Sequence, residues 1–503
     1  MAGSVQLLCL ATSSGVPLYC RSKGESRQLP FSVIGSLNGV HMFGSNQDVL
    51  LTSTCTDNTR VCWRVFRDRC SVEIVLTCCI AVWYGNCTTA DRRVQNCPAH
   101  IRHQPPHHQG YMYRKHSVTA FQIHNSDPSV WLCLCFKNIP GKVGPYCANS
   151  LFPWLRSITL IVMSSEEDAS DLYLSRLLDN VFSAMVLVIG LDDLVNLKNV
   201  ERLKRELRAC YKLIDSLLAA SDWMGDLTLC VDCVVSPDAA ILQEALEVFV
   251  AAAESNFGCL MVMGKVVVAT EKWWRLAAQE VVLLAWLVGS LAPSSSRDYP
   301  IYLPHGSPTV PHRLLTFQLV PGVDVCLLCG PTPSLQQVQS ELVERFWSPL
   351  LEPLKTCFRL HHSSFPACSP LHHSIVGLLL INREQNKNLF TLQPHGVENT
   401  QQHGAILPPE SRRSVLRQLY TLAVSAYFPA DTPDDEPALH EEFHAGFTHS
   451  PSECYVVAED HKCYGIQTQQ HQLFLTFTAD TPTFALRNIA TKTLNLLTKE
   501  VPF

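Results

Sequence analysis

Apolar and polar positions along the chain repeat one order of elements three times. The first unit opens with VQLLCLATSSGVPLYC, whose alternating apolar positions predict a hairpin that turns at Ser14 and Gly15. A helix follows, opened by Pro30, because proline at the first turn of a helix loses no intrahelical hydrogen bond. Strands around VLLTSTCTDNTRVCWRVF come next, with Asp57 and Asn58 as turn residues. The predicted core face of the helix consists of Val33, Ile34, Leu37 and Val40.

The second and third units repeat this order. The second opens with the hairpin CLMVMGKVVVAT, has a buried apolar helix at 281–291, and continues with a hairpin that turns at Pro321 and Gly322. The third opens with IVGLLLINREQNKNLFTLQ, continues with the helix RRSVLRQLYTLAVSAYF, and has the later strands CYVVAED, CYGIQTQ and HQLFLTFT. The fold class predicted is α/β (α+β), with three small domains that each have a five-stranded antiparallel sheet flanked by helices.

One segment interrupts the first unit. The strand VCWRVF should turn through Arg67 and Asp68 into SITLIVMSS, but the chain departs for the 88 residues 69–156. This insert holds 8 of the 22 cysteines and nine Lys/Arg against three Asp/Glu, so it carries a net +6 and the rest of the chain −12. An insertion at a hairpin tip leaves the flanking ladder intact and adds little loop-closure free energy. We expect it to be disordered or non-native, as a translated intron would be.

Three functional interpretations of the insert stay open. A metal module would use Cys97, His100, His103, His107 and His108, although their spacing fits no standard zinc pattern. A glycan on the NCT sequence at 86–88 would need a secretory route. A nucleic-acid patch would need clustered positive charge, whereas these charges are scattered among prolines.

The units and the insert together predict the domain organisation. The first domain comprises 1–68 plus 157–222, the second 223–360 and the third 375–503, with 361–374 as a linker. At 503 residues and 47% hydrophobic content, the chain can build three cores.

Charge and segment hydropathy narrow the class of protein. The net charge of −6 gives no general attraction to nucleic acid. The first residues, MAGSVQLLCLATSSG, lack the basic region of a signal peptide, and the longest apolar run, 281–292, is too short to span a bilayer. We therefore expect a soluble cytoplasmic protein whose cysteines are mostly reduced core thiols.

The sharpest chemical motif is HEEFHAGFTH at 440–449. An H-E-x-x-H helix places two imidazoles one turn apart beside a glutamate, which suits zinc and a general base, so His440, Glu441 and His444 define a zinc peptidase as the alternative function. A third ligand at workable spacing is missing, because Gly446 comes one residue too early for the metzincin continuation. We expect no metal site here.

Other cysteine and histidine clusters favour structural roles. Two C-x2-C pairs occur, Cys230 with Cys233 and Cys326 with Cys329, and the second pair lies in a strand, where its thiols would point to opposite faces. The linker TCFRLHHSSFPACSPLHHS carries zinc-type ligands at spacings unlike known zinc knuckles. The chain has no Walker phosphate loop, dinucleotide fingerprint or nucleophile elbow, so we expect no cofactor and a scaffold or regulator.

Three stretches carry a resemblance to a known family. LPFSVIGSLNGVHMFG, NVERLKRELRACYKLIDSLL and RDYPIYLPHGSPTVPHRLL closely resemble the Fuzzy family of planar cell polarity effectors. The likeness covers 1–68 and 157–360 strongly and the third unit more loosely, and it skips 69–156. It implies three longin domains in the element order predicted above.

The resemblance also implies partners and a cellular place. It implies a non-enzymatic subunit that pairs with an Inturned-like tri-longin protein, joins a WD-repeat planar polarity effector, and acts at the cytoskeleton and the basal body of the cilium. The pair would promote nucleotide exchange on a Rab-family GTPase and support transport to the cilium during its biogenesis, with a peripheral membrane contact. A pure scaffold without exchange activity is the other alternative. We expect the helix after Pro30 to contribute to the partner surface, through outward residues such as Asn38 and His41.

Overall fold

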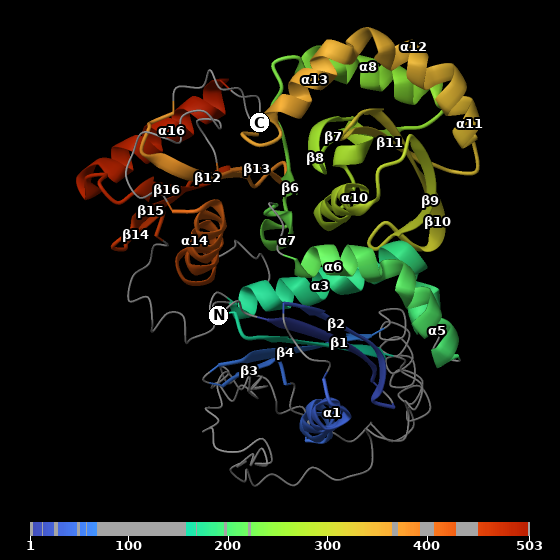
Figure 1. The fold of residues 1–503 in the computed structure, drawn as a ribbon, viewed down its shortest axis with the longest axis vertical. Helices are drawn as coiled ribbons and strands as arrows, with labels where there is room; N and C mark the ends of the chain where they lie inside the picture. Colours follow the sequence, from blue (N-terminus) through green and yellow to red (C-terminus); the bar gives the residue numbers. More distant parts are fainter. Residues whose placement is uncertain are drawn as a thin grey trace, which may run out of the picture.

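A computed structural model gives the fold of the chain (Figure 1). It describes residues 4–12, 14–24, 29–47, 51–56, 58–67, 157–166, 169–195, 199–219, 223–364, 371–392, 407–428 and 451–500. The predicted insert at 69–156 and the H-E-x-x-H motif at 440–444 lie outside the described residues.

The first domain is built on an antiparallel sheet of strand order β2-β1-β5-β4-β3. Along β1, residues on both faces are buried, because helices cover the sheet on each side. Arg67 of β4 pairs with Ser157 of β5, which confirms the predicted pairing across the insert. The elements are β1 (Val5–Ala11), β2 (Val16–Lys23), α1 (Phe31–Asn46), β3 (Ser53–Cys55), β4 (Arg60–Arg67) and β5 (Ser157–Ser164).

Helices cover the two faces of this sheet unequally. Of the described helices, α1 lies on one face, whereas α3 and α6 cover the other and separate the sheet from the second domain (Figure 1). The Ser170 side chain caps α3 by accepting from Tyr173 N, and the helix ends at Gly190, whose φ is 91°. The helices of this layer are α3 (Asp171–Ile189), α4 (Leu191–Val195), α5 (Val200–Glu206), the 3-10 turn η1 (Leu207–Cys210) and α6 (Tyr211–Leu218).

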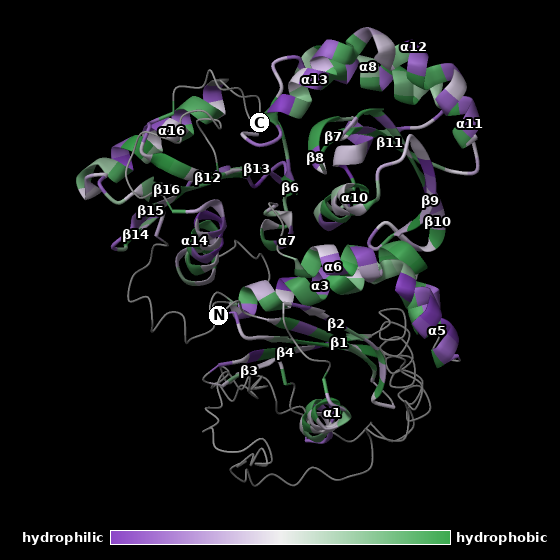
Figure 2. Ribbon diagram, viewed as in Figure 1, coloured by the Kyte–Doolittle hydropathy of each residue, from purple (hydrophilic) through white to green (hydrophobic). Residues whose placement is uncertain are grey.

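α3 is long and apolar enough to cross a membrane by length and composition alone. In the fold, 67% of its most apolar window is buried, and it packs against α6, η1 and the strand β9 (Ser296–Leu303) of the second domain. Figure 2 shows α5, in contrast, as mainly hydrophilic. The apolarity of α3 is accounted for by burial between two domains.

The second domain repeats the sheet, in the order β8-β7-β11-β10-β9. β10 and β11 turn at Pro321 and Gly322, as predicted, with Gly322 at φ 79°. Its elements are α7 (Gly225–Thr228), β6 (Val231–Asp232), α8 (Ala239–Ala252), β7 (Phe257–Val262), β8 (Lys265–Ala269), α9 (Glu271–Trp274), α10 (Ala278–Ser290), β9 (Ser296–Leu303), β10 (Ser307–Val320), β11 (Val323–Cys329), α11 (Leu335–Gln337), the π-helix η2 (Val338–Val343), α12 (Glu344–Trp347), the 3-10 turn η3 (Ser348–Leu350) and α13 (Leu351–Leu360).

The third domain differs from the prediction by one strand. Its sheet has the order β14-β15-β16-β12-β13-β6, because β6 adds to β13 in parallel. The prediction of five strands was incomplete here, since a two-residue strand from a distant segment has no sequence pattern of its own. The elements are β12 (Ile375–Asn382), β13 (Lys387–Thr391), α14 (Pro409–Leu422), the π-helix η4 (Ala423–Tyr427), β14 (Glu453–Val457), β15 (His461–Gln467), β16 (His471–Thr478), the 3-10 turn η5 (Thr483–Ala485) and α16 (Leu486–Glu500).

Among the residues that the structure describes, three hydrophobic clusters form the core. The largest is continuous across the three domains, and a second lies between the second sheet and the layer of α8 and α13. The third, beneath α1, is small and consists of Leu8, Leu10, Ile34, Val61, Trp63 and Ile161. From α1, Ile34 belongs to that cluster and Leu37 packs against it, so a narrow side of the helix contributes to the core.

Candidate functional site

The outward surface of α1 is apolar. Phe31 is 83% exposed, and Val33, Met42 and Phe43 are also exposed. The helix buries a narrow stripe against the sheet, consisting of Ile34, His41 and Gly44. Large apolar side chains on the solvent face of a helix are typical of a surface that binds another protein.

The two residues predicted to point outward from α1 do not both do so. His41 is 6% exposed and faces the sheet, so the prediction of an outward His41 is wrong. Neither of its ring nitrogens has a hydrogen-bond partner among the described residues, and burial lowers its pKa below the ordinary value. Asn38 is half-buried, with its amide over Gly15 in the turn between β1 and β2.

The error comes from a helix that is apolar on every side. Val33 and Ile34 are adjacent and lie about 100° apart, and the narrow buried stripe of α1 takes in Ile34 but leaves Val33 exposed. A sequence with seven large apolar side chains in the 16 residues of α1 has too many for one buried stripe. That excess was the signal in the sequence for an interaction surface.

Reactive cysteines are not found at the C-x2-C pairs. Cys230 and Cys233 are buried, and burial raises the pKa of each thiol to about 12. Burial also raises the pKa of Cys326 and Cys329. A thiol at such a pKa has almost no thiolate near neutral pH, so these residues act as apolar core side chains.

Metal ligands do not converge within the described residues. No group of three or more His, Cys, Asp or Glu side chains in this part of the chain is placed to hold a metal ion. Cys357 of the linker cluster is instead buried on α13 and donates to the hydroxyl of Ser236. Its predicted companion Cys368 lies outside the described residues, as do His440, Glu441 and His444, so the expectation for the H-E-x-x-H motif stays a prediction.

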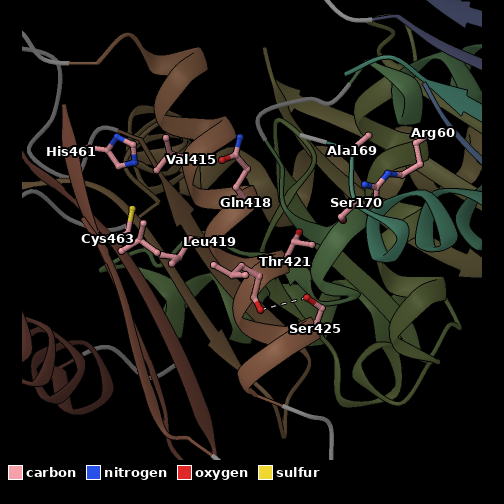
Figure 3. A pocket seen from close by; sticks show the side chains of 12 residues that line it. Arg60, Ala169, Ser170, Val415, Gln418, Leu419, Thr421, Ser425, His461 and Cys463 are labelled. Carbon is pink, nitrogen blue, oxygen red and sulfur yellow. Dashed lines mark hydrogen bonds between the residues drawn. The ribbon is translucent and has the colours of Figure 1, made fainter. Parts of the chain in front are cut away.

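A cavity of about 460 Å³ lies between the first and third domains (Figure 3). Arg60 and Ser170 lie on one wall, and His461 and Cys463 of β15 lie on the other. Arg60 forms an ion pair with Asp171 at 3.0 Å, and Ser170 caps α3. These polar groups already have structural partners, and the cavity holds no paired nucleophile and base within hydrogen-bond distance.

A buried polar network joins the three domains at α7. Arg417 of α14 donates to both carboxylate oxygens of Asp226, at 3.0 and 2.7 Å. Asn180 of α3 donates to the backbone carbonyl of Asp226 at 2.9 Å. Asp232 accepts from the backbone N–H groups of Met224 and Gly225, and burial raises its pKa to about 6. The network thus ties α3, α7 and α14 into one junction.

Comparison with known proteins agrees with this arrangement. Family models for the first, second and third Longin domains of FUZ, MON1 and HPS1 match residues 5–76 with 149–217, residues 253–348 and residues 374–501. The first of these matches is split around most of the predicted insert.

Relatives match over nearly the whole chain. "Protein fuzzy homolog" of Xenopus tropicalis is 55% identical over 502 residues, with 99% of each chain covered. "Protein fuzzy homolog" of Homo sapiens is 43% identical over 506 residues, covering 99% of this chain and 98% of the human protein. The protein of that name from Mus musculus is 42% identical over 501 residues, covering 98% and 97%.

Proposed function

Because the chain belongs to the Fuzzy family of tri-longin planar cell polarity proteins, we propose that it works as a non-enzymatic subunit paired with an Inturned-like tri-longin protein. The pair promotes nucleotide exchange on a Rab-family GTPase and supports transport to the cilium. A WD-repeat planar polarity effector joins the pair at the basal body, where the complex makes peripheral membrane contact.

The observation that carries the proposal is the exposed apolar face of α1. Phe31 and Met42 lie about 20° apart around the helix and together present large apolar side chains to solvent on the first longin domain. Such a face favours burial against another protein, since covering a Phe side chain removes roughly 150–250 Å² from water. We assign this face to the partner surface, in place of the outward His41 expected from the sequence.

Exchange of nucleotide needs no catalytic residues on this chain. An exchange factor binds the nucleotide-free form of a GTPase more tightly than the loaded form, so its effect is one of differential affinity. Standard stable interfaces bury about 800 Å² per partner, which is a large share of one small domain. A platform shared between two first domains meets that requirement more readily than one domain alone.

The test is release of a fluorescent guanine nucleotide from Rab GTPases, measured with this chain, with the Inturned-like partner, and with both together. We expect acceleration only with the pair. Full activity from this chain alone would refute the shared platform, and a stable pair that is inactive on every Rab would favour the pure scaffold.

Charge substitutions on α1 locate the surface. Phe31→Asp and Met42→Asp should each weaken pairing or exchange at least tenfold without unfolding the domain, because neither side chain lies in the core. Val310→Asp, at an exposed apolar position on β10 of the second domain, is the matched control and should leave both unchanged.

A further inference from the structure

The free edge of the third sheet carries an exposed apolar strand. β14 is the outermost strand, and its Tyr455 and Val457 are 62% and 52% exposed. Both lie on the same face, because they are two residues apart in a strand. Exposed apolar edge strands invite pairing with another chain, and proteins usually avoid them with charge or proline.

The hydrogen bonds of β14 show which of its backbone groups face outward. Ala458 N donates to His461 O, and Gln467 N donates to Ser452 O, so residues 452 and 458 point toward β15. Inward and outward groups alternate along an antiparallel strand. The N–H and C=O groups of Glu453, Tyr455 and Val457 therefore point away from the sheet.

The equivalent edge of the second sheet, and the opposite edge of the third sheet, are both covered. In the second domain the corresponding strand, β9, is covered by α3 of the first domain. At the opposite edge of the third sheet, β6 is added to β13, with Val231 N donating to Asn386 O and Cys233 N donating to Asn388 O, both at 2.9 Å. The third sheet thus already accepts one added strand, and β14 is its uncovered edge among the described residues.

The residues around β14 add to its exposed apolar surface, and one face of the strand lies next to the first domain. Lys462, the pairing partner of Val457, donates to Thr481 O, three residues before Phe484, which is 89% exposed. On the other face of the strand, Val456 lines the cavity between the domains, whose opposite wall includes Arg60 of β4 (Figure 3). A protein seated on β14 would therefore also reach the first domain.

We propose that β14 binds an extended apolar strand of the tri-longin partner, which continues the third sheet by backbone hydrogen bonds to Glu453, Tyr455 and Val457. This inference rests on the proposed function for the identity of the partner. Outward N–H and C=O groups at every second residue fit only an extended backbone, and Tyr455, Val457 and Phe484 select apolar side chains on it. The sheet edge sets the register of the partner, while α1 supplies most of the buried area.

The test uses the co-purified pair and two readouts. In the wild-type complex, we expect amide hydrogen exchange in the peptide spanning 453–457 to slow at least tenfold relative to the free chain. Tyr455→Pro should weaken pairing about tenfold, equivalent to ~1.4 kcal/mol. Proline removes an N–H that points away from β15, so the ladder within the domain stays intact.

Control variants separate the backbone contribution from loss of the fold. Tyr455→Phe keeps both the N–H and the apolar ring and should retain most of the affinity, whereas Val457→Lys should weaken it by placing charge on the edge. Exchange of the β15 and β16 amides reports whether each variant remains folded.

Each outcome decides between the possibilities. A pair that forms normally with Tyr455→Pro, without protection of 453–457, overturns the inference and leaves the proposed function standing. Absence of any pair with wild-type protein overturns both. Protection that appears in the isolated chain with rising concentration would assign the edge to a second copy of this chain instead.

Discussion

Replacing Arg417 with methionine should loosen the junction of the three domains. The guanidinium binds both carboxylate oxygens of Asp226 and lies over the ring of Tyr173, 5.2 Å from its centroid. Asp226 is 3% exposed at its side chain, so water cannot replace the lost partner. Methionine fills much of the volume of the arginine stem, and the main effect is therefore an uncompensated buried charge.

The expected loss of stability is large. Removing one partner of a buried ion pair costs about 3–5 kcal/mol, because the remaining charge stays desolvated. At ~1.4 kcal/mol per factor of ten, opening of the junction becomes about two to three and a half orders of magnitude more frequent. Changing both partners, as in Arg417→Met with Asp226→Leu, should recover most of the loss, since an apolar replacement of the whole pair is often neutral.

Hydrogen exchange is the appropriate measurement, because a chain of three domains need not unfold in one step. Peptides covering 223–232 and 409–422 should exchange at least a hundredfold faster in Arg417→Met. The control is Lys355→Met, which breaks an exposed i,i+3 pair with Glu352 on α13 and should change local exchange less than about threefold. An effect of Arg417→Met as small as that of the control would refute the reasoning.

Three further predictions concern other parts of the chain. Burial lowers the pKa of His41, so the unfolded state binds a proton more readily than the folded state does. The free energy of unfolding is therefore unaffected by this histidine above its ordinary pKa of about 6.5 and decreases as the pH falls below that value. Between pH 7.5 and 5.5 the melting temperature of wild type should therefore fall further than that of His41→Leu, and equal shifts in differential scanning calorimetry would contradict this. Deletion of 69–156 should leave the first domain folded, because β4 and β5 pair up to Arg67 and Ser157. If size-exclusion chromatography shows that the deletion variant aggregates while the full chain stays soluble, the insert is structural. Purified protein should contain no stoichiometric zinc that His440→Ala with His444→Ala removes, as checked by elemental analysis.

The order of elements could be predicted from the sequence because each sheet is built from local hairpins. Hairpins at 5–23 and 307–329 follow from alternating apolar residues around turn residues, which is information contained in neighbouring positions. Pairing of β4 with β5 was also predictable, although 69–156 intervenes, since the repeat in the second domain supplied the expected partner. These features follow from the periodicity of apolar residues along the chain, which can be read without knowing any tertiary contact.

Features set by contacts between domains could not be predicted in this way. β6 has two residues, and its place in the third sheet depends on hydrogen bonds to Asn386 and Asn388. Burial of His41 depends on which side of an all-round apolar helix meets the sheet, and periodicity alone does not decide that. The exposed edge at Tyr455 is likewise a property of the assembled sheet, because an alternating strand looks the same at an edge and in the centre.

The position of β6 has a consequence for synthesis of the chain on the ribosome. Val231 emerges before the strands of the second sheet, but its pairing partner Lys387 follows only after that sheet is complete. At about 5–20 residues per second, the backbone groups of β6 that pair with β13 stay unpaired for roughly 8–30 s. Asp226 waits still longer for Arg417, which is encoded further downstream. In a nascent chain that stops before the third domain, the backbone groups of β6 and the carboxylate of Asp226 would therefore lack their partners while the first two domains are otherwise folded. Chaperones and quality-control proteases recognise such incompletely folded states.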